Sequence, residues 1–566
     1  METKKTVLAL LSAVLLLAGC GKDPSSDNGK GGGSTPSETP VSGNIQGRVL
    51  SSSGQPIAGV VVSDGLNCTR TNSKGEWGIE SDLASTDYVF VSTPSDYSAP
   101  LVDGTPVFWK FLSELTKSGG QYRNVDFTLE PISRPDRFTI IIFADPQPRS
   151  KGAGYDNMGY HALDCNDDMY RDMKEYVSNI TDRPVYGICL GDIVHQNLNL
   201  LPAHKSGMAA TGIRNYNVIG NHDHDISKTT DDRDAARPFE AVLGPVNYSF
   251  DLGGLHVVVL DNMIAPLGDN GKISDSCKDG LTDEIWQWLQ NDMAFVPKDR
   301  TVMVCAHSPM FRLIGGKERS ARHSTDYRKL FQEYSKVLSW AGHNHCTLNY
   351  VNTSNPVIES HIVTRVTGDL WTNEYLGSNG TPRGYIVFDY KDGSYDWHFK
   401  PIYYQTGAFT GTYGGGGKQP SYTYRDWDYD ASGKAVMRLD GHPLDENYQM
   451  QVFAPGTYGD DYLYANIFLW DELWDNPKFT INGVPKKMVR VTAPSSTEDD
   501  KRYSYANREL KEFYNENNSY LHDGSYGFVN SNTESMFRVF VDDEHGSGTV
   551  SVKDRFGNTY SQKIVW

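Results

Sequence analysis

The sequence predicts a layered α/β domain that lies between two β-rich domains. From about Arg134 to Tyr404, apolar runs such as Phe138 to Phe143 alternate with helix-like stretches such as His161 to Asn179. This alternation is typical of a layered α/β domain whose ligand-binding loops lie at the strand ends. The flanking regions instead show short apolar runs separated by frequent turn signals. A chain of 566 residues is also too long for a single hydrophobic core, so we expect about three domains.

The first 20 residues have the pattern of a targeting segment. Lys4 and Lys5 precede an apolar run from Val7 to Ala18, which is too short to span a bilayer. The run ends in Leu-Ala-Gly-Cys20, which resembles a bacterial lipobox, so we expect a lipid on the thiol of Cys20. The alternative is an ordinary secretory signal with a chance cysteine. The lipobox predicts a protein of the bacterial cell envelope, anchored to a membrane through its lipid and facing the periplasm or the cell surface.

The region before the α/β domain divides into two parts. Residues 21–42 have almost no apolar side chains, which predicts a flexible linker. Residues 43–133 contain the strand candidates Ile45 to Leu50, Val60 to Val62 and Tyr88 to Val91. This pattern resembles a small β-sandwich of the transthyretin-like or carboxypeptidase-regulatory-like kind. It carries no catalytic constellation, so we expect a spacer or docking module.

The α/β domain is predicted to occupy residues 134–404, and a β-rich domain follows over residues 405–566. Within the former, Val185 to Leu190, Asn217 to Ile219 and Leu255 to Leu260 are strand-like, and Asp283 to Met293 is an amphipathic helix. Within the latter, Tyr464 to Trp470 alternates at period two, as expected for a strand of a β-sandwich.

Charge and cysteine spacing limit the classes of partner. The formal net charge of -18 argues against binding to duplex nucleic acid, which needs an excess of lysine and arginine. It does not exclude a phosphorylated substrate, because bound divalent cations would reverse the local field. Apart from Cys20, the cysteines show no CxxC spacing, so a thiolate metal site is not expected.

Five polar motifs each follow an apolar, strand-like run. They are Ala144-Asp145-Pro146-Gln147, Gly191-Asp192-Ile193-Val194-His195, Gly220-Asn221-His222-Asp223, Ala306-His307-Ser308-Pro309 and Gly342-His343-Asn344-His345. Each strand thus delivers oxygen or imidazole ligands at its tip. Two divalent ions about 4 Å apart can generate hydroxide near neutral pH and hold the oxygens of a phosphate ester. A shared carboxylate reduces the repulsion between such ions, and neutral imidazoles and amides complete their ligand shells.

In order and spacing, these motifs resemble those of the calcineurin-like metallophosphoesterases, over about residues 137 to 400. The resemblance implies a four-layer α/β/β/α domain, between the two β-sandwich domains, that binds two divalent metal ions (Mn, Fe, Zn or Mg). Its implied ligands are Asp145, Gln147, Asp192 and His345 for one ion, and Asp192, Asn221, His307 and His343 for the other, with Asp192 bridging.

The resemblance also implies two catalytic residues. His222 would contact the phosphoryl group and stabilise or protonate the leaving oxygen, and Asp223 would orient His222. Gln147 stands where the family usually has histidine, and its carbonyl oxygen is a harder and weaker donor. We therefore expect the first ion to be held more loosely or to be of a harder type, such as Mn or Mg. His195, His204, His224 and His323 lie near the motifs but are expected to be structural.

Together these features predict an exported, lipid-anchored phosphoesterase that uses a metal-bridging hydroxide on a phosphorylated small molecule or lipid. Hydrolysis of a phosphomonoester is the preferred activity. One alternative is a phosphodiesterase acting on phospholipid head groups or nucleotides. Another is a surface adhesion protein whose metal site is only structural. The intact His222 and Asp223 argue against the adhesion protein, since neither is needed merely to hold metal.

Overall fold

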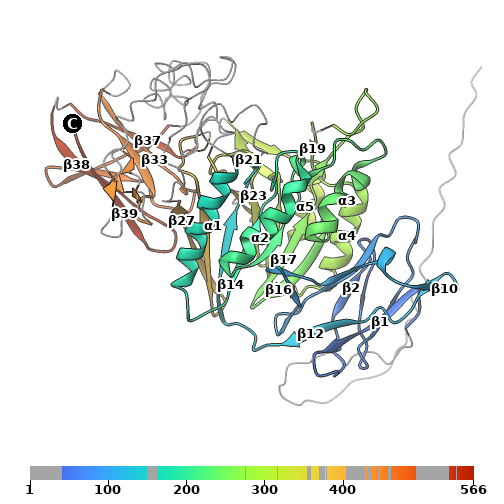
Figure 1. Cartoon of the computed structure of the whole chain (residues 1–566). Coiled ribbons are helices and arrows are strands. Elements are labelled where there is room, and N and C mark those ends of the chain that lie inside the picture. Colours follow the sequence, from blue (N-terminus) through green and yellow to red (C-terminus); the bar gives the residue numbers. More distant parts are fainter. Residues whose placement is uncertain are drawn as a thin grey trace, which may run out of the picture.

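The computed structural model describes residues 41–148, 162–274, 276–314, 317–352, 358–368, 377, 379–402, 446–456, 461–491, 534–542 and 545–566, and four short strands between 428 and 443. The predicted signal peptide with Cys20, and nearly all of the predicted linker, lie outside the described residues. Figure 1 shows the central α/β region between an N-terminal and a C-terminal β-rich region. Within the described residues, no helix combines the length and hydrophobicity needed to span a membrane.

The N-terminal region is built from two main sheets. The six-stranded sheet has the order β10-β11-β1-β12-β6, with β4 also paired to β1, and the four-stranded sheet has the order β3-β2-β5-β9. Val49 of the first and Val62 of the second belong to one buried apolar cluster. The strands and a 3-10 turn are β1 (Ile45–Ser51), β2 (Val61–Ser63), β3 (Cys68–Arg70), β4 (Glu76–Ile79), β5 (Tyr88–Ser92), β6 (Tyr97–Ser98), β7 (Leu101–Val102), β8 (Thr105–Pro106), β9 (Trp109–Phe111), η1 (Leu112–Glu114), β10 (Lys117–Ser118), β11 (Gln121–Tyr122) and β12 (Phe127–Pro131). Its classification as a β-sandwich stays a prediction.

Two larger sheets form the centre of the α/β region. The first has the order β15-β14-β13-β26-β27, and the second has the order β16-β17-β20-β23-β25-β24. Strands β13, β14 and β15 are parallel to one another, as are β17, β20, β23 and β25. Their bounds are β13 (Arg137–Phe143), β14 (Val185–Cys189), β15 (Arg214–Asn217), β16 (Tyr248–Leu252), β17 (Leu255–Leu260), β20 (Thr301–Ala306), β23 (Lys336–Ala341), β24 (Leu348–Asn352), β25 (Ile358–Ile362), β26 (Gly384–Lys391) and β27 (Ser394–Pro401).

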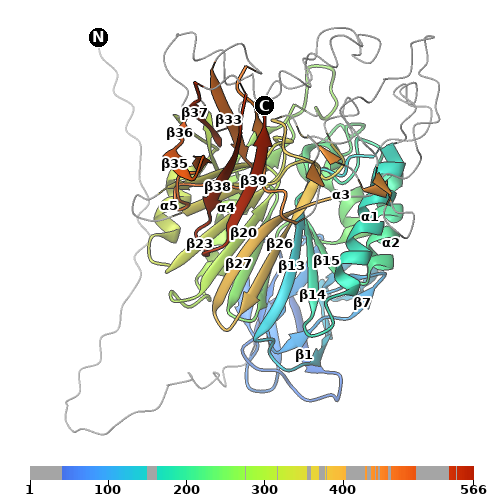
Figure 2. The ribbon, with the colours of Figure 1, turned by 90° about the vertical axis from the view of Figure 1, so that its left-hand side faces the viewer.

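Alternate side chains of β13 show how the layers stack. Ile140 and Ile142 belong to the buried cluster that contains the strands of the second sheet. Ile141 and Phe143 point the other way, into a cluster with Met169 of α1. A strand buried on both faces needs a continuous apolar run, which β13 has. The layered α/β prediction is therefore confirmed, and Figure 2 shows the two sheets with helices on their outer sides.

The helices complete the outer layers. Helices α1 (Ala162–Ser178), α2 (Leu201–Thr211) and α3 (Asp232–Leu243) contribute to the cluster beside the first sheet. Helices α4 (Asp283–Met293) and α5 (Ser324–Phe331) contribute to the cluster of the second sheet. The shorter elements of this region are η3 (Leu198–Leu200), η4 (Asn221–Asp223), β18 (Met263–Ile264), β19 (Lys278–Asp279), β21 (Phe311–Ile314) and β22 (Lys317–Ser320).

The C-terminal region contains two four-stranded antiparallel sheets, β32-β33-β37-β36 and β35-β34-β38-β39. Arg555, in the turn between β38 and β39, pairs with Glu359 of β25 and with Asp471, and so ties this region to the second sheet. The strands are β28 (Asp428–Tyr429), β29 (Ala435–Val436), β30 (Arg438–Leu439), β31 (His442–Pro443), β32 (Met450–Phe453), β33 (Tyr462–Ile467), β34 (Lys478–Ile481), β35 (Val484–Lys487), β36 (Val489–Arg490), β37 (Met536–Phe540), β38 (Ser547–Lys553) and β39 (Thr559–Val565). The domain boundaries predicted from the sequence stay predictions.

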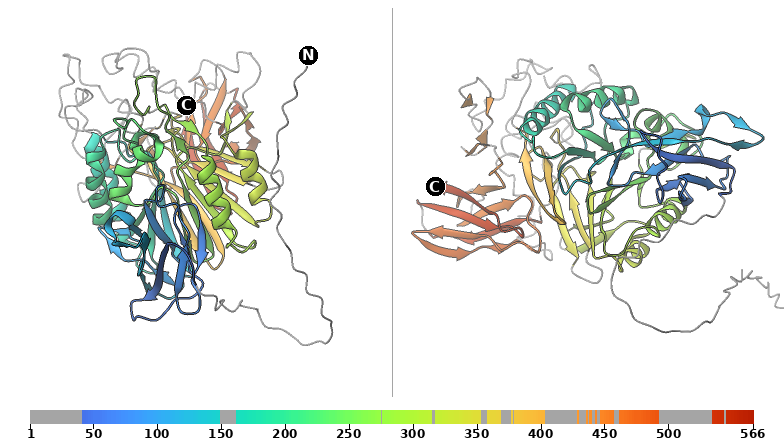
Figure 3. Two further views of the ribbon diagram at one scale, coloured as in Figure 1. Left: turned by 90° about the vertical axis from the view of Figure 1, so that its right-hand side faces the viewer. Right: turned by 90° about the horizontal axis from the view of Figure 1, so that it is seen from below.

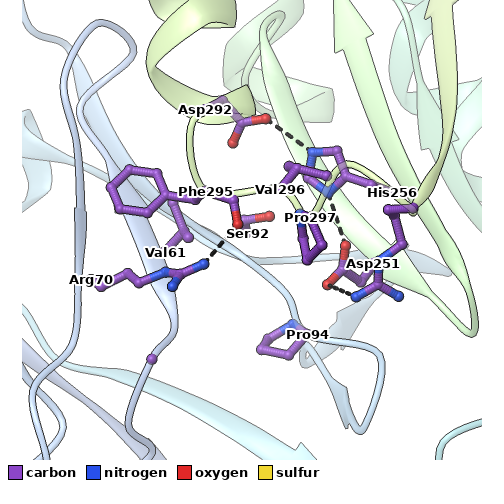
Figure 4. A pocket seen from close by; sticks show the side chains of 12 residues that line it. Val61, Arg70, Ser92, Pro94, Asp251, His256, Asp292, Phe295, Val296 and Pro297 are labelled. Carbon is purple, nitrogen blue, oxygen red and sulfur yellow. Dashed lines mark hydrogen bonds and ion pairs between the residues drawn. The ribbon is translucent and has the colours of Figure 1, made fainter. Parts of the chain in front are cut away.

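The N-terminal region packs against the α/β region, as Figure 3 shows from two further sides. A pocket at this contact contains a buried histidine, His256, between two carboxylates (Figure 4). Its Nδ1 lies 2.8 Å from Asp251 and its Nε2 lies 3.0 Å from Asp292. Burial alone would lower the pKa of His256, but the hydrogen bonds to Asp251 and Asp292 raise it to about 9. The histidine is therefore charged at neutral pH and joins β16, β17 and α4.

Candidate metal centre

The five motifs meet at one edge of the two central sheets. Asp145 follows β13, Asp192 follows β14 and Asn221 begins η4 after β15, all in the first sheet. His307 follows β20 and His343 follows β23, in the second sheet. Carboxyl ends of parallel strands lie at the same edge of a sheet, so each sheet presents its motifs on one side. The second sheet's two motifs are joined directly, because the Gly342 amide donates to the His307 carbonyl at 2.9 Å.

Five of the predicted ligands have a left-handed backbone. The φ values are 55° for Asp145, 40° for Gln147, 49° for Asp192, 66° for His343 and 53° for His345. This conformation costs a residue with a side chain about 1–2 kcal/mol. Such strain persists only where the surroundings impose it, and it is concentrated at functional sites.

The structure brings the predicted ligands of the first ion together. One ligand atom from each of Asp145, Asp192 and His345 lies within 4.8 Å of the other two. The Gln147 amide nitrogen is 2.7 Å from Asp192 Oδ2. Gln147 Oε1 is buried and has no hydrogen-bond partner among the described residues. A buried carbonyl oxygen without a partner is costly, and coordination of a cation would remove that cost.

The predicted ligands of the second ion form an adjoining group in which acceptor atoms converge. His307 Nδ1 lies 2.8 Å from the carbonyl oxygen of Leu190, to which it must donate. In a neutral ring, His307 Nε2 is then an acceptor. It faces Asn221 Oδ1 at 3.2 Å, His343 Nδ1 at 3.2 Å and Asp192 Oδ2 at 3.3 Å. Converging acceptors are the arrangement that a cation stabilises, so the residues present fit a metal.

Protons compete with a metal ion for the imidazole nitrogens of the second ion's predicted ligands. Burial lowers the pKa of His307, but Asp192 and Asp145 outweigh it and raise that pKa to about 10. Burial and the neighbouring His307 lower the pKa of His343 to about 4. Because a ligating imidazole must give up its proton, we expect metal binding here to release protons.

The two predicted catalytic residues lie beside this cluster. The His222 amide donates to Asp192 Oδ1 at 2.8 Å, and its ring lies against His195 with 4.0 Å between the ring centroids. Asp223 is fully buried and accepts from the amides of Ile193, Val194 and Gly220 at 3.0, 2.9 and 2.9 Å. The carboxylate of Asp223 therefore joins the second and third motifs. Its predicted role in orienting the His222 ring stays a prediction.

Sequence reasoning missed a buried arginine that holds the first motif. Arg365 is 1% exposed and donates to the carbonyl oxygens of Asp145, Gln147 and Gly368 at 3.0, 3.2 and 2.9 Å. Thr367 Oγ1 adds a bond of 2.9 Å to the carbonyl of Pro146. The available signal was an arginine three residues after the end of the β25 segment, and local pattern does not distinguish such a residue from a solvated charge. His195 was likewise expected to be structural, and the structure places it against His222.

Two family models match segments of the chain on either side of the five motifs. The family model described as N terminal of Calcineurin-like phosphoesterase matches residues 43–132, and the model described as C terminal of Calcineurin-like phosphoesterase matches residues 360–560. All five motifs lie between these two segments. No match was found among curated proteins.

Several solved structures show a distant similarity to the chain. A dimetal phosphatase from Danio rerio is 13% identical, with a TM-score of 0.31, over 46% of this chain and 98% of that one. A purple acid phosphatase from yellow lupin seeds is 16% identical, with a TM-score of 0.31, over 46% of this chain and 51% of that one. A 5'-nucleotidase precursor from Thermus thermophilus is 11% identical, with a TM-score of 0.27, over 47% and 54%.

The layered fold and its metal-ligand cluster define a metal-dependent phosphoesterase. With both family models matched on either side of the motifs, the chain belongs to the calcineurin-like phosphoesterases. The family implies divalent metal ions, and the two groups around Asp192 are where this chain would hold them.

Proposed function

We propose that this phosphoesterase hydrolyses phosphomonoesters at the cell envelope, to which its lipidated Cys20 attaches it. The observation that carries the catalytic part is the place of Asp192, which belongs to both groups of candidate ligands. Two divalent ions held there would make water a stronger nucleophile and neutralise charge on the phosphoryl oxygens. The envelope location rests on the sequence pattern that ends at Cys20.

The chain's own residues have distinct tasks in this proposal. Asp192 positions the backbone of His222 through its Oδ1 and presents its Oδ2 to His307. His222, which is only partly buried, contacts the phosphoryl group and donates a proton to the leaving oxygen. The neighbouring ring of His195 adds a second imidazole for the terminal oxygens. A phosphomonoester has one more of these charged oxygens than a diester, which favours the monoester as substrate.

The test compares substrates and one variant. The purified chain should hydrolyse an alkyl phosphate faster than the matching dialkyl phosphate, and the reverse order would favour the alternative phosphodiesterase. In His222→Ala, metal content should be unchanged while turnover of the alkyl phosphate falls on the order of a hundredfold, the usual scale for one acid–base group. The loss should be smaller for nitrophenyl phosphate, whose leaving group needs little protonation.

The matched control is His545→Ala, an exposed histidine of the C-terminal region, which should keep full activity. Unchanged turnover of the alkyl phosphate by His222→Ala would contradict its proposed role. Loss of metal together with activity would make His222 a ligand instead. A protein that binds metal but turns over no phosphate ester would support the adhesion alternative.

A further inference from the structure

A third cluster of possible metal ligands lies outside the five motifs' ligand set. It consists of His224, which follows η4, Asp232 at the start of α3, and Asp261, which follows β17. One atom from each of these side chains lies within 4.8 Å of the other two. None of the three belongs to the groups around Asp192, and the sequence offered no spacing that would link them.

The imidazole of His224 is fully buried, with its side chain 0% exposed, and it is fixed at one nitrogen only. Its Nδ1 lies 2.9 Å from the carbonyl oxygen of Gly220 and must donate to it. Its Nε2 has no hydrogen-bond partner among the described residues. This nitrogen points at Asp232 Oδ1 and Asp261 Oδ2, at 3.6 and 3.7 Å. Both distances are too long for hydrogen bonds.

Backbone amides satisfy one oxygen of each carboxylate. Asp232 Oδ1 accepts from the amide of Ala265 at 2.7 Å, and Asp261 Oδ1 accepts from the amide of Met263 at 3.1 Å. In the part of the chain that the structure describes, no lysine or arginine lies within ion-pair distance of either carboxylate. Two carboxylates and a buried imidazole therefore face one another across a gap that none of their own hydrogen bonds closes.

We propose that His224, Asp232 and Asp261 bind a single divalent cation, for which Zn²⁺ is the best match. Ligands at the usual Zn²⁺ bond lengths in a tetrahedral site lie about 3.3 Å apart, slightly closer than the 3.6 and 3.7 Å observed. One imidazole and two carboxylates leave the fourth position to water, and two negative charges balance the ion. The bond from Nδ1 to a backbone carbonyl is the usual second contact of a zinc-bound histidine.

This cation would influence the loop that carries Asn221 and His222 through one residue, Gly220. Gly220, whose carbonyl oxygen holds His224, directly precedes the predicted ligand Asn221. A cation at His224 therefore fixes the start of the loop that carries Asn221 and His222. The proposed ion is structural, because none of its three ligands belongs to the groups around Asp192.

A proton is the competing occupant of the gap. Burial lowers the pKa of His224, but Asp261 and Asp232 outweigh it and raise that pKa to about 9. An imidazolium between two carboxylates would explain the cluster without metal. The two occupants are distinguished by measuring bound metal.

The experiment measures Zn²⁺ per chain in the purified full-length protein after equilibration with buffered Zn²⁺. Asp261→Asn should lose about one Zn²⁺ relative to the unmodified chain. Asp234→Asn, which changes a partly buried carboxylate of α3 that points to Arg237 instead of His224, should lose none. Equal Zn²⁺ content in Asp261→Asn and the unmodified chain would overturn the proposal and leave His224 as a protonated ion-pair partner.

A second arm separates this site from the catalytic pair. In Asp192→Asn, which removes the carboxylate shared by both groups of the catalytic pair, one Zn²⁺ should remain and should be lost when Asp261→Asn is added. Loss of all Zn²⁺ in Asp192→Asn alone would also overturn the proposal, whatever its effect on activity. If circular dichroism shows that Asp261→Asn does not fold, Asp232→Asn replaces it, because the Asp232 side chain is 24% exposed, against 5% for Asp261, and water can solvate the changed group.

Discussion

Replacing Arg365 by lysine tests whether the first ion depends on an imposed backbone conformation. Arg365 donates to the carbonyl oxygens of Asp145, Gln147 and Gly368. A lysine keeps the charge, but a single nitrogen on a flexible stem cannot reproduce the planar fork of the guanidinium. Asp145 and Gln147 both have positive φ, which costs about 1–2 kcal/mol per residue. If the loop relaxes, about 2–4 kcal/mol must be restored on binding, which lowers the affinity for the first ion about 30- to 1000-fold.

The second ion should be nearly unaffected in the same variant. Its ligands Asn221, His307 and His343 make none of the hydrogen bonds recorded for Arg365. The assay is a competition titration with a metal chelator on the unmodified chain and on Arg365→Lys. Arg383→Lys is the matched control, because Arg383 is equally buried and pairs with Asp168 of α1. Equal weakening of both ions, or unchanged affinity for the first, would refute the reasoning.

Three further predictions follow from single residues. Asp192→Asn should lower the content of both ions and abolish activity, unlike Arg365→Lys, because the carboxylate belongs to both groups; metal analysis that finds either ion fully retained would argue against a bridge. The raised pKa of His256 should contribute about 3 kcal/mol to unfolding free energy below pH about 6.5, lost as pH rises through about 9. Urea unfolding should show that the difference in unfolding free energy between the unmodified chain and His256→Gln shrinks as the pH rises across this range. A difference that stays constant would contradict the assignment. Cys20→Ser should release the protein from washed membranes in fractionation, and full retention would exclude the lipid anchor.

Local pattern was sufficient for many of the elements. The predicted helix from Asp283 to Met293 and the predicted strand from Leu255 to Leu260 have the bounds of α4 and β17. Helix α4 also carries its own start signal, since the Thr282 side chain accepts from the amide of Ile285. The short strand predicted over 217–219 was wrong in its bounds, because β15 spans Arg214–Asn217. Its register is set by pairing with β14, which a single strand's sequence does not encode.

The sequence by itself determined the chemistry of the centre. A strand places the residues that follow it at a sheet edge, so five apolar runs, each with a polar tip, indicated a metal centre, and the family resemblance of the motifs implied which of their residues are ligands. Both inferences need only local order along the chain, so they could be made before any contact was known, and the individual ligand roles stay predictions.

Only the tertiary structure decided which distant groups meet. β13 pairs with β26, more than two hundred residues away, and Arg365 reaches the first motif only because the two sheets close on each other. The gap among His224, Asp232 and Asp261 arises in the same way, from a loop, a helix start and a strand end that no spacing connects. The physical reason is that such contacts are set by packing both faces of the sheets at once, whereas local pattern specifies one face of one element.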